Sequence, residues 1–239
     1  MYTVVIFIFF LNETTNAQIV ISKPSLGFTQ ACASPSFNTY NVTFSFSPES
    51  ALGSGNQFIV ELSDGDSSFS NPTAVYTSGA GTVTTSPVTF SFSVPTTTAG
   101  EAFRIRVKST SPTSISSSSN VFAGYYKIQD TPFSVNNLIA SGAYCSGGSY
   151  LLTIDNPGGV SNDSPLKYPS LTFKWYKETS PTTSVFVADG ETLSVNQPGT
   201  YFVETNYGSC TSNSFSNRVT VTEASSGSTS IISSRFGKP

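Results

Sequence analysis

Apolar and polar residues alternate along several short stretches of this chain, with the period of two residues that is typical of a β-strand. No helical period lies between these stretches, so the first half is predicted to be a β-sandwich. The segments expected to be strands in this half are residues 40–46, 58–62, 88–94, 103–108 and 121–128.

The second half continues the pattern with further short strands. The segments expected to be strands here are residues 150–155, 171–177, 185–188, 192–195, 200–205 and 217–222. The connection at residues 156–169 holds three prolines and two glycines, which predicts a surface loop.

The stretch at residues 197–210 organises the chain: a turn, a strand, and a second turn at 207–209 that leads to Cys210. A cysteine at 145, the single tryptophan Trp175 within a strand, and then a Gly-x-Tyr strand form an immunoglobulin-like pattern. Trp175 shares one strand face with apolar neighbours, which favours a place in the core over a carbohydrate-stacking platform. The residues expected in this core are Phe173, Trp175, Tyr201 and Val203.

The first 17 residues are predicted to be a secretory signal peptide. Residues 4–11 are an apolar run too short to span a bilayer, and Thr15-Asn16-Ala17 is a small-residue cleavage site. The segment before the apolar run carries no Lys or Arg, so an uncleaved anchor or a misplaced start codon is the alternative.

The predicted fold class is therefore all-β, with two tandem Ig-like β-sandwich domains after a signal peptide. The two halves resemble each other, because Cys32 and Cys145 each stand shortly before an alternating strand, so we interpret them as divergent copies of one module. The predicted segments are a signal peptide at 1–17, an N-terminal β-sandwich at 18–128, an Ig/PKD-like β-sandwich at 129–222 and a Ser/Gly-rich linker at 223–239.

The composition excludes several classes of function. Only 10% of residues are charged, the net charge is −3 and no basic stripe is present, so nucleic-acid binding has no electrostatic basis. The chain has no histidine, which removes the commonest general base and zinc ligand. Asp189 and Glu191 lie in a predicted turn, and Asp64 and Asp66 with Glu61 do not complete a calcium loop. We expect no catalytic residues, no metal and no cofactor.

Three cysteines are an odd number for an exported protein. We expect a bond between Cys145 and Cys210, because thiols rarely persist in an oxidising compartment. The geometry is difficult, since Val203 rather than Cys210 stands two residues after Tyr201, where an antibody domain has its cysteine. A bond from Cys32 to either of the others would instead staple the two modules together.

Two groups of outward residues are candidates for a ligand surface. Tyr176 and Phe202 are outward aromatics suited to stacking on a sugar, although any sandwich exposes some aromatic residues. Arg104 and Arg106, in line with Lys108, form a row that suits an anionic polymer, but a solvated face is the commoner meaning of such a row.

Several short segments resemble the immunoglobulin- and PKD-like repeats of large surface proteins in gliding bacteria that use the type 9 secretion system. In the second half they are Gly147-Gly148-Ser149-Tyr150-Leu151-Leu152, Phe173-Lys174-Trp175-Tyr176-Lys177, Gly199-Thr200-Tyr201-Phe202-Val203 and Asn206-Tyr207-Gly208-Ser209-Cys210. In the first half they are Phe58-Ile59-Val60-Glu61-Leu62-Ser63-Asp64 and Ala99-Gly100-Glu101-Ala102-Phe103-Arg104-Ile105-Arg106-Val107.

The resemblance implies an exported adhesin or structural spacer at the cell surface of a Gram-negative-type bacterium. The C-terminal sorting domain of the family is missing, so we expect a truncated N-terminal piece that meets the secretion machinery only as part of the full-length protein. Surface glycans or other proteins are the expected partners, with no membrane span after signal cleavage. The alternatives are a carbohydrate-binding accessory module of a secreted glycan-degrading enzyme and a secreted hydrolase.

Overall fold

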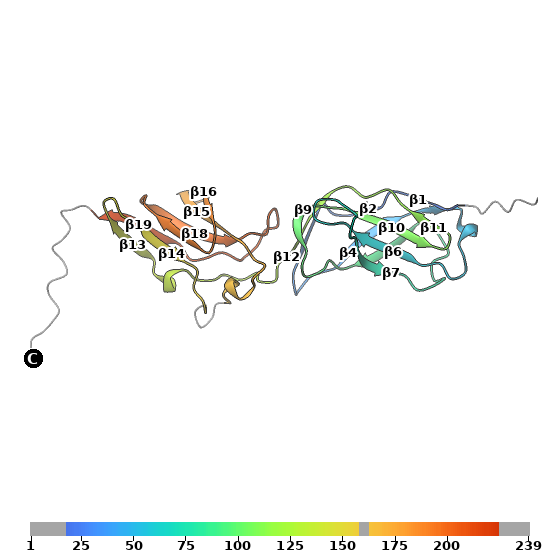
Figure 1. Cartoon of the computed structure of the whole chain (residues 1–239), viewed down its shortest axis with the longest axis horizontal. Coiled ribbons are helices and arrows are strands. Elements are labelled where there is room, and N and C mark those ends of the chain that lie inside the picture. Colours follow the sequence, from blue (N-terminus) through green and yellow to red (C-terminus); the bar gives the residue numbers. More distant parts are fainter. Residues whose placement is uncertain (1–17, 158–162, 225–239) are drawn as a thin grey trace, which may run out of the picture. The chain divides into compact units, whose positions relative to one another are not determined.

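The computed structural model describes residues 18–157 and 163–224, and these residues form β-strands joined by turns and loops (Figure 1). Within these ranges there are three 3-10 turns, at Glu49–Ala51, Asn136–Leu138 and Pro165–Lys167, and no α-helix. No helix of the described part is long and apolar enough to cross a membrane. The all-β prediction is confirmed, whereas the predicted signal peptide and most of the predicted linker lie outside the described residues.

The chain forms two compact units, and neither is continuous in sequence. Of the described residues, unit 1 comprises 18–29, 40–93 and 103–121, and unit 2 comprises 30–39, 94–102, 122–157 and 163–224. This division differs from the predicted boundary between residues 128 and 129, because three segments of the first half, residues 30–39, 94–102 and 122–128, belong to unit 2.

Unit 1 is a two-layered β-sandwich with a small additional strand pair. One layer has the strand order β11-β10-β6-β7, the other has the order β2-β4-β8, and β1 pairs with β5. Its strands are β1 (Val20–Ile21), β2 (Ser25–Leu26), β4 (Tyr40–Phe44), β5 (Phe46–Ser47), β6 (Phe58–Leu62), β7 (Thr73–Thr77), β8 (Val88–Phe92), β10 (Ile105–Thr110) and β11 (Thr113–Ile115).

Aromatic side chains fill the space between the two layers of unit 1. The alternation in β4 and β8 directs every second residue inward, so Phe44 and Phe90 lie buried with ring centroids 5.6 Å apart. Phe44 also contacts Phe58 of the opposite layer at 5.2 Å, and Phe90 contacts Tyr76 at 4.5 Å. These contacts between the layers account for the strict period of two seen in the sequence.

Unit 2 contains a three-stranded sheet and a second β-sandwich, which we call the C-terminal sandwich. The three-stranded sheet has the order β3-β12-β9, and the sandwich has a five-stranded layer, β13-β19-β18-β15-β16, and the strand pair β14-β17. These strands are β3 (Gln30–Ala33), β9 (Ala99–Phe103), β12 (Phe122–Tyr126), β13 (Ser141–Cys145), β14 (Tyr150–Thr153), β15 (Phe173–Ser180), β16 (Thr183–Asp189), β17 (Thr192–Val195), β18 (Gly199–Thr205) and β19 (Val219–Ala224).

The core of the C-terminal sandwich is built around Trp175. Its side chain is 0% exposed, and its indole Nε1 donates a hydrogen bond of 2.9 Å to the carbonyl oxygen of Gly190. The structure places Phe173, Tyr201 and Val203 in the same buried cluster, together with residues of the β14-β17 layer such as Leu152. All four residues predicted for this core are therefore buried together.

Tyr201 also closes the turn that precedes β18. Its hydroxyl donates a hydrogen bond of 2.8 Å to the carbonyl oxygen of Gln197, four residues upstream. A tyrosine near the start of this strand that bonds back to the preceding backbone is the tyrosine corner of immunoglobulin-like domains. The strand order and this corner together identify the C-terminal sandwich as Ig-like.

The substitution Tyr201→Phe is expected to destabilise the C-terminal sandwich by about 0.5–1.5 kcal/mol, because it removes a buried hydrogen bond and keeps the ring. The matched control is Tyr144→Phe, since the Tyr144 hydroxyl is buried with no hydrogen-bond partner among the described residues. Urea unfolding followed by circular dichroism should show a lower midpoint for the first variant and an unchanged or higher one for the second. Equal midpoints for both would contradict the role given to Tyr201.

Candidate functional site

The disulfide in this chain joins Cys32 to Cys210, with a Cα–Cα distance of 5.5 Å, and Cys145 is a free, exposed thiol. The predicted bond between Cys145 and Cys210 is therefore wrong. Cys145 ends β13, where it pairs in register with Ala224 at the last residue of β19, while Cys210 lies in the loop before β19 begins. The two cysteines thus lie at opposite ends of the sheet, and a disulfide requires Cα atoms within about 7 Å.

Cys32 reaches Cys210 from the three-stranded sheet. It lies in β3, which runs parallel to β12 with Cys32 opposite Tyr125. Tyr125, Ala123, Tyr207 and Cys210 form a small buried cluster of their own, with Cys32 packed against it. The bond therefore fastens the loop between β18 and β19, residues 206–218, to this sheet. We call this segment the β18–β19 loop.

Glu101 of β9 provides a second attachment for the β18–β19 loop. Its carboxylate accepts hydrogen bonds from the Ser209 backbone N–H at 3.0 Å, the Ser209 hydroxyl at 3.1 Å and the Tyr125 hydroxyl at 2.9 Å. Burial acts to raise the pKa of Glu101, but these hydrogen bonds outweigh it and lower the pKa below its usual range. Burial, and then the neighbouring Glu101, raises the pKa of Tyr125 to about 12.

Gly208 is required where the loop passes over this carboxylate. Its φ is +52°, and a Cβ atom there would lie 2.0 Å from Glu101 Oε1 and 2.3 Å from the Tyr125 hydroxyl. A larger residue would therefore be strained at this φ and would displace the Glu101 or Tyr125 side chain that holds the loop.

The segment after β12 holds the rest of the β18–β19 loop. The Tyr207 hydroxyl donates to the carbonyl oxygen of Gln129 at 2.7 Å, and burial is the main cause that raises the pKa of Tyr207 to about 12. Asp130 accepts hydrogen bonds from the Ser212 hydroxyl at 2.7 Å and the Asn213 N–H at 2.8 Å. With the disulfide, these bonds fix the loop from Tyr207 to Asn213.

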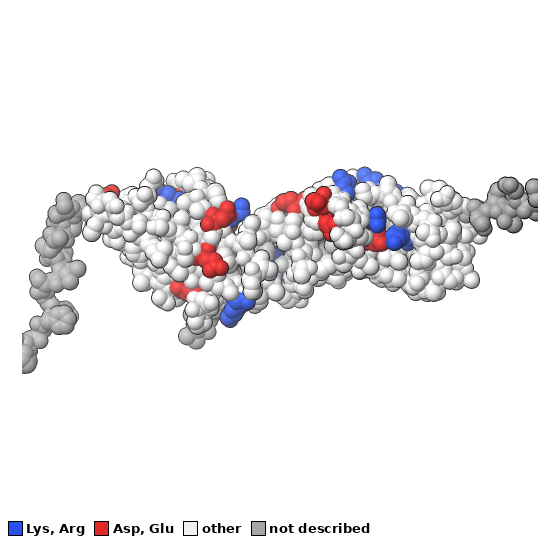
Figure 2. Space-filling view, viewed as in Figure 1, with Lys and Arg blue, Asp and Glu red and all other residues white. Residues whose placement is uncertain are grey.

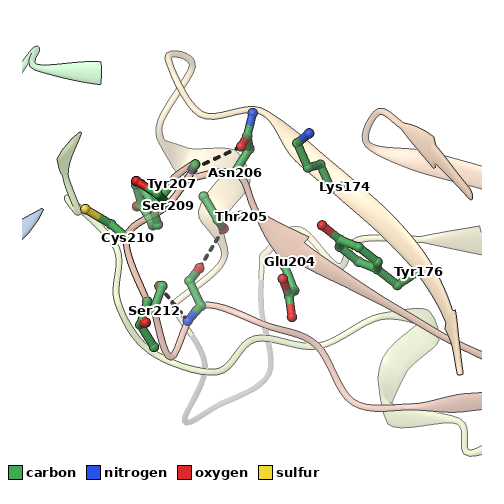
Figure 3. A pocket seen from close by; sticks show the side chains of 12 residues that line it. Lys174, Tyr176, Glu204, Thr205, Asn206, Tyr207, Ser209, Cys210 and Ser212 are labelled. Carbon is green, nitrogen blue, oxygen red and sulfur yellow. Dashed lines mark hydrogen bonds between the residues drawn. The ribbon is translucent and has the colours of Figure 1, made fainter. Parts of the chain in front are cut away.

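A groove of about 450 Å³ lies between this fixed loop and the outer face of the five-stranded layer (Figure 3). Lys174 and Tyr176 of β15 and Glu204 of β18 form one side. The β18–β19 loop, including Ser209 and Ser212, forms the other side. The period of two explains the first side: Phe173, Trp175 and Val203 point inward, so their neighbours point outward into the groove.

Glu204 is the least compensated charged group in the groove. The cross-strand partner of Glu204 is Lys174, whose Nζ lies instead 5.3 Å from the centre of the Phe186 ring. Among the described residues the Glu204 carboxylate has neither a hydrogen-bond donor nor an ion-pair partner within 4 Å. Burial raises the pKa of Glu204, and the positive charge of Arg218 offsets only part of this effect.

The predicted aromatic surface residues have different environments. Tyr176 is partly exposed and lines the groove. Its partial burial, and after it the negative charges of Glu204 and Asp189, raise the pKa of its hydroxyl. Phe202 lies on the same outer face and stacks on Tyr176 at 5.5 Å, but Arg218 covers it at 4.2 Å. Phe202 is only 4% exposed, so the prediction of an accessible Phe202 is wrong.

The predicted cationic row in unit 1 is engaged within the protein. Arg106 and Lys108 both pair with Glu61, at 2.6 Å and 3.1 Å, and Arg106 also lies 4.4 Å from the centre of the Phe69 ring. Arg104 donates a hydrogen bond of 2.7 Å to the carbonyl oxygen of Ser119. On the face shown in Figure 2, charged side chains are few and neither sign forms a continuous stripe. The row therefore stabilises unit 1 and does not form a free basic surface.

The described residues contain no group of three or more His, Cys, Asp or Glu side chains arranged to hold a metal ion. Glu61, considered above as a calcium ligand, is occupied by the two cations of β10. Asp66 accepts the Ser68 N–H and Asp64 accepts the Ser70 hydroxyl, as is usual in a polar turn.

Sequence reasoning identified Tyr176 but missed Glu204 and Lys174 as parts of one groove. The sequence did carry a signal for Glu204 as an outward-facing polar group. It is the one charged residue of the strand at 199–205, and it lies on the face opposite Tyr201 and Val203. The loop that completes the groove depends on Cys32 and Glu101, which are more than 100 residues away in sequence.

No protein family model and no curated protein sequence matches this chain. Similar solved structures include three N-terminal domains of the bacteriophage RB49 Highly Immunogenic Outer Capsid protein (Hoc), at 12% identity and a TM-score of 0.27, over 86% of this chain and 59% of that one. Another is the BSP domain of a biofilm associated protein, at 15% identity and a TM-score of 0.28, over 86% of this chain and 30% of that one.

The FN1–FN3 domains of chicken CNTN1 are similar at 10% identity and a TM-score of 0.29, over 84% of this chain and 66% of that one. This chain spans less than two thirds of the length of each of the three. At these TM-scores the likenesses carry no argument, and the fold assignment rests on the strand order, the core and the tyrosine corner described above.

Proposed function

We propose that this chain is a binding region of an exported, non-catalytic surface protein and that it works as an adhesin. The observation that carries the proposal is the β18–β19 loop, which a disulfide and the Glu101 hydrogen bonds hold in place beside an open groove. A loop fixed before a ligand arrives loses little conformational freedom on binding, which favours affinity.

The disulfide also supports export, because such bonds persist mainly in oxidising compartments. The sequence resemblance supports a place among type 9 secretion surface proteins of gliding bacteria. In that setting the secretion machinery is a partner of the full-length protein, and the cell surface is where the module works.

The groove supports binding more than catalysis. Glu204 is the sole acidic residue among the described residues that line it, whereas glycoside hydrolysis needs a pair of carboxyl groups flanking the bond. Without a histidine in the chain, the lining serines have no imidazole to activate them as nucleophiles.

Adhesion is tested by coating beads with the purified chain from residue 18 onward and measuring their retention under flow. The surfaces carry a neutral polysaccharide, an anionic polysaccharide or an extracellular matrix protein, and soluble chain is the competitor. We expect retention on at least one surface that the soluble chain abolishes, with no depolymerisation of either polysaccharide. Beads that are retained nowhere, or turnover that a single carboxylate-to-amide substitution abolishes without unfolding, would contradict the proposal.

A second candidate function, a carbohydrate-binding accessory module of a secreted enzyme, is favoured by the same groove and its aromatic neighbours. It predicts binding to the polysaccharide that the attached enzyme degrades. The full-length reading frame distinguishes the two, since an adhesin continues into further repeats and an accessory module into a catalytic domain.

A further inference from the structure

The groove presents three polar side chains whose hydrogen-bonding capacity is not used within the protein. These are the Lys174 ammonium, the Tyr176 hydroxyl and the Glu204 carboxylate, none of which makes a hydrogen bond to another described residue. They are a donor, a donor that also accepts, and an acceptor. All three project from neighbouring positions of two paired strands, with Lys174 opposite Glu204.

The facing loop has already used most of its polar groups. The hydroxyls of Ser209 and Ser212 donate to Glu101 and Asp130, and the Ser214 hydroxyl is bonded to Gln129. The loop therefore acts mainly as a rigid wall, and the ligand-facing chemistry comes from the strand side of the groove.

The charges around the groove disfavour a ligand of either sign. An anion placed there would meet the Glu204 carboxylate, and a cation would meet Lys174. Arg218 also contributes a positive charge near Glu204, although its own guanidinium is paired with Glu178 at 2.9 Å. A ligand that is uncharged but rich in hydroxyls avoids both penalties.

A ligand rich in hydroxyl groups can use all three unused side chains. Its hydroxyls can donate to the carboxylate of Glu204, accept from the ammonium of Lys174, and pair with the Tyr176 hydroxyl. The apolar face of a sugar ring suits the aromatic pair of Tyr176 and Phe186 beside the groove, where Phe186 is 51% exposed.

We propose that this groove binds a neutral carbohydrate, with Glu204, Lys174 and Tyr176 as its hydrogen-bonding residues. The proposal rests on the proposed adhesive function and names its ligand class.

The unpaired carboxylate predicts opposite effects of one substitution on binding and on stability. Glu204→Gln removes a partly buried charge that has no ion-pair partner among the described residues, so the C-terminal sandwich should melt at the same or a higher temperature. It also removes the charge-assisted acceptor, so carbohydrate affinity should fall at least about tenfold. A residue that only supports the fold would not raise stability while lowering affinity.

The test is affinity electrophoresis of the chain in gels containing mannan, laminarin or dextran as neutral polysaccharides, and alginate or chondroitin sulfate as anionic ones. We expect at least one neutral polysaccharide to retard the wild-type chain, equally at low and at 0.5 M salt, since an uncharged ligand is not screened. Glu204→Gln should weaken this retardation at least about tenfold, and Tyr176→Phe should reduce it several-fold. The control Glu223→Gln, an exposed carboxylate on β19, should leave it unchanged.

The pH dependence follows from the raised pKa of Glu204. The ionised carboxylate is the better acceptor, so affinity should decline as the pH falls through this raised pKa, while the residual binding of Glu204→Gln stays flat. Four results would each overturn the proposal. They are retardation by anionic polysaccharides alone, binding of a lysine-rich peptide alone, no retardation by any neutral polysaccharide, and unchanged binding by Glu204→Gln. Beads that still adhere to a protein surface would keep the adhesive function and remove only its carbohydrate ligand.

Discussion

Replacing Trp175 with alanine is expected to destabilise the C-terminal sandwich by about 3–5 kcal/mol, the usual range for truncating a large buried aromatic residue. The side chain is 0% exposed and lies in a cluster to which both layers contribute residues. Its loss therefore leaves a cavity that neither layer can fill alone. The indole hydrogen bond to Gly190 is lost as well, which leaves that carbonyl unpaired. Because domains of this size have a free energy of unfolding of only about 5–15 kcal/mol, the sandwich should lose much of its stability.

Differential scanning calorimetry and far-ultraviolet circular dichroism are the suitable measurements, because Trp175 is the sole tryptophan and its fluorescence vanishes with the substitution. Tyr176→Ala is the matched control, since that neighbour faces outward and is partly exposed. It should weaken carbohydrate binding with a much smaller shift in melting temperature. The reverse pattern, with binding lost and melting unchanged in Trp175→Ala, would place Trp175 in a ligand site and contradict the core assignment.

Removing the Cys32–Cys210 bond by the double substitution Cys32→Ser and Cys210→Ser is expected to have an effect of similar size. The bond closes a loop with a sequence separation of 178 residues, for which the chain-entropy relation gives roughly 5 kcal/mol as an upper value. The buried cluster of Ala123, Tyr125 and Tyr207 around the bond should also pack less well. The β18–β19 loop would then keep only its hydrogen bonds.

Chemical unfolding measures the loss of stability, and hydrogen exchange measures the loosening of the β18–β19 loop. The midpoint should fall markedly, and the amides of the β18–β19 loop should exchange faster than those of β15 or β18. Cys145→Ser is the control, because that thiol is exposed and unbonded, and its effect should lie within about 0.5 kcal/mol of zero. Peptide mapping without reductant should recover a Cys32–Cys210 pair; recovery of a Cys145–Cys210 pair would contradict the structure.

Most of the strands that the sequence predicted share one property: a buried face that is specified locally. β6 and β17 have the predicted bounds, and β15, β16 and β18 differ only by a few residues at their ends. In each of these except β16, alternation or an apolar run reports burial directly. β16 is an edge strand with exposed Val185, Phe186 and Val187, and its β-branched composition was sufficient to reveal it.

Two of the strands that the sequence missed, β3 and β13, depend on distant partners. β3 (Gln-Ala-Cys-Ala) and β13 (Ser-Gly-Ala-Tyr-Cys) consist largely of small residues with weak β-propensity. Each is a strand because it pairs in parallel with the last strand of its half, β3 with β12 and β13 with β19. Cys32 and Cys145 therefore occupy corresponding strands, but only Cys32 lies beside the loop that carries Cys210.

The same limit applies to the groove. Tyr176 was predictable as an outward aromatic residue, because Trp175 fixes which face of β15 is buried. The burial of Phe202 was not predictable. Arg218, which covers the Phe202 ring, lies 16 residues later in sequence, at the end of the β18–β19 loop. The cations at 104 and 106 were correctly placed outside the core, but their partners Ser119 and Glu61 are set by strand pairing and packing.

An amide chemical-shift titration of the isotope-labelled chain with a neutral oligosaccharide tests the central claim most directly. That claim is that the groove between the outer face of β15 and β18 and the fixed β18–β19 loop is the ligand site of an adhesive module. The predicted result is saturable shifts at residues 174–176 and 204–212, which disappear in Glu204→Gln while the rest of the spectrum is retained. Shifts confined to the exposed edge strand β16 or to unit 1, or no shifts with any neutral oligosaccharide, would contradict it.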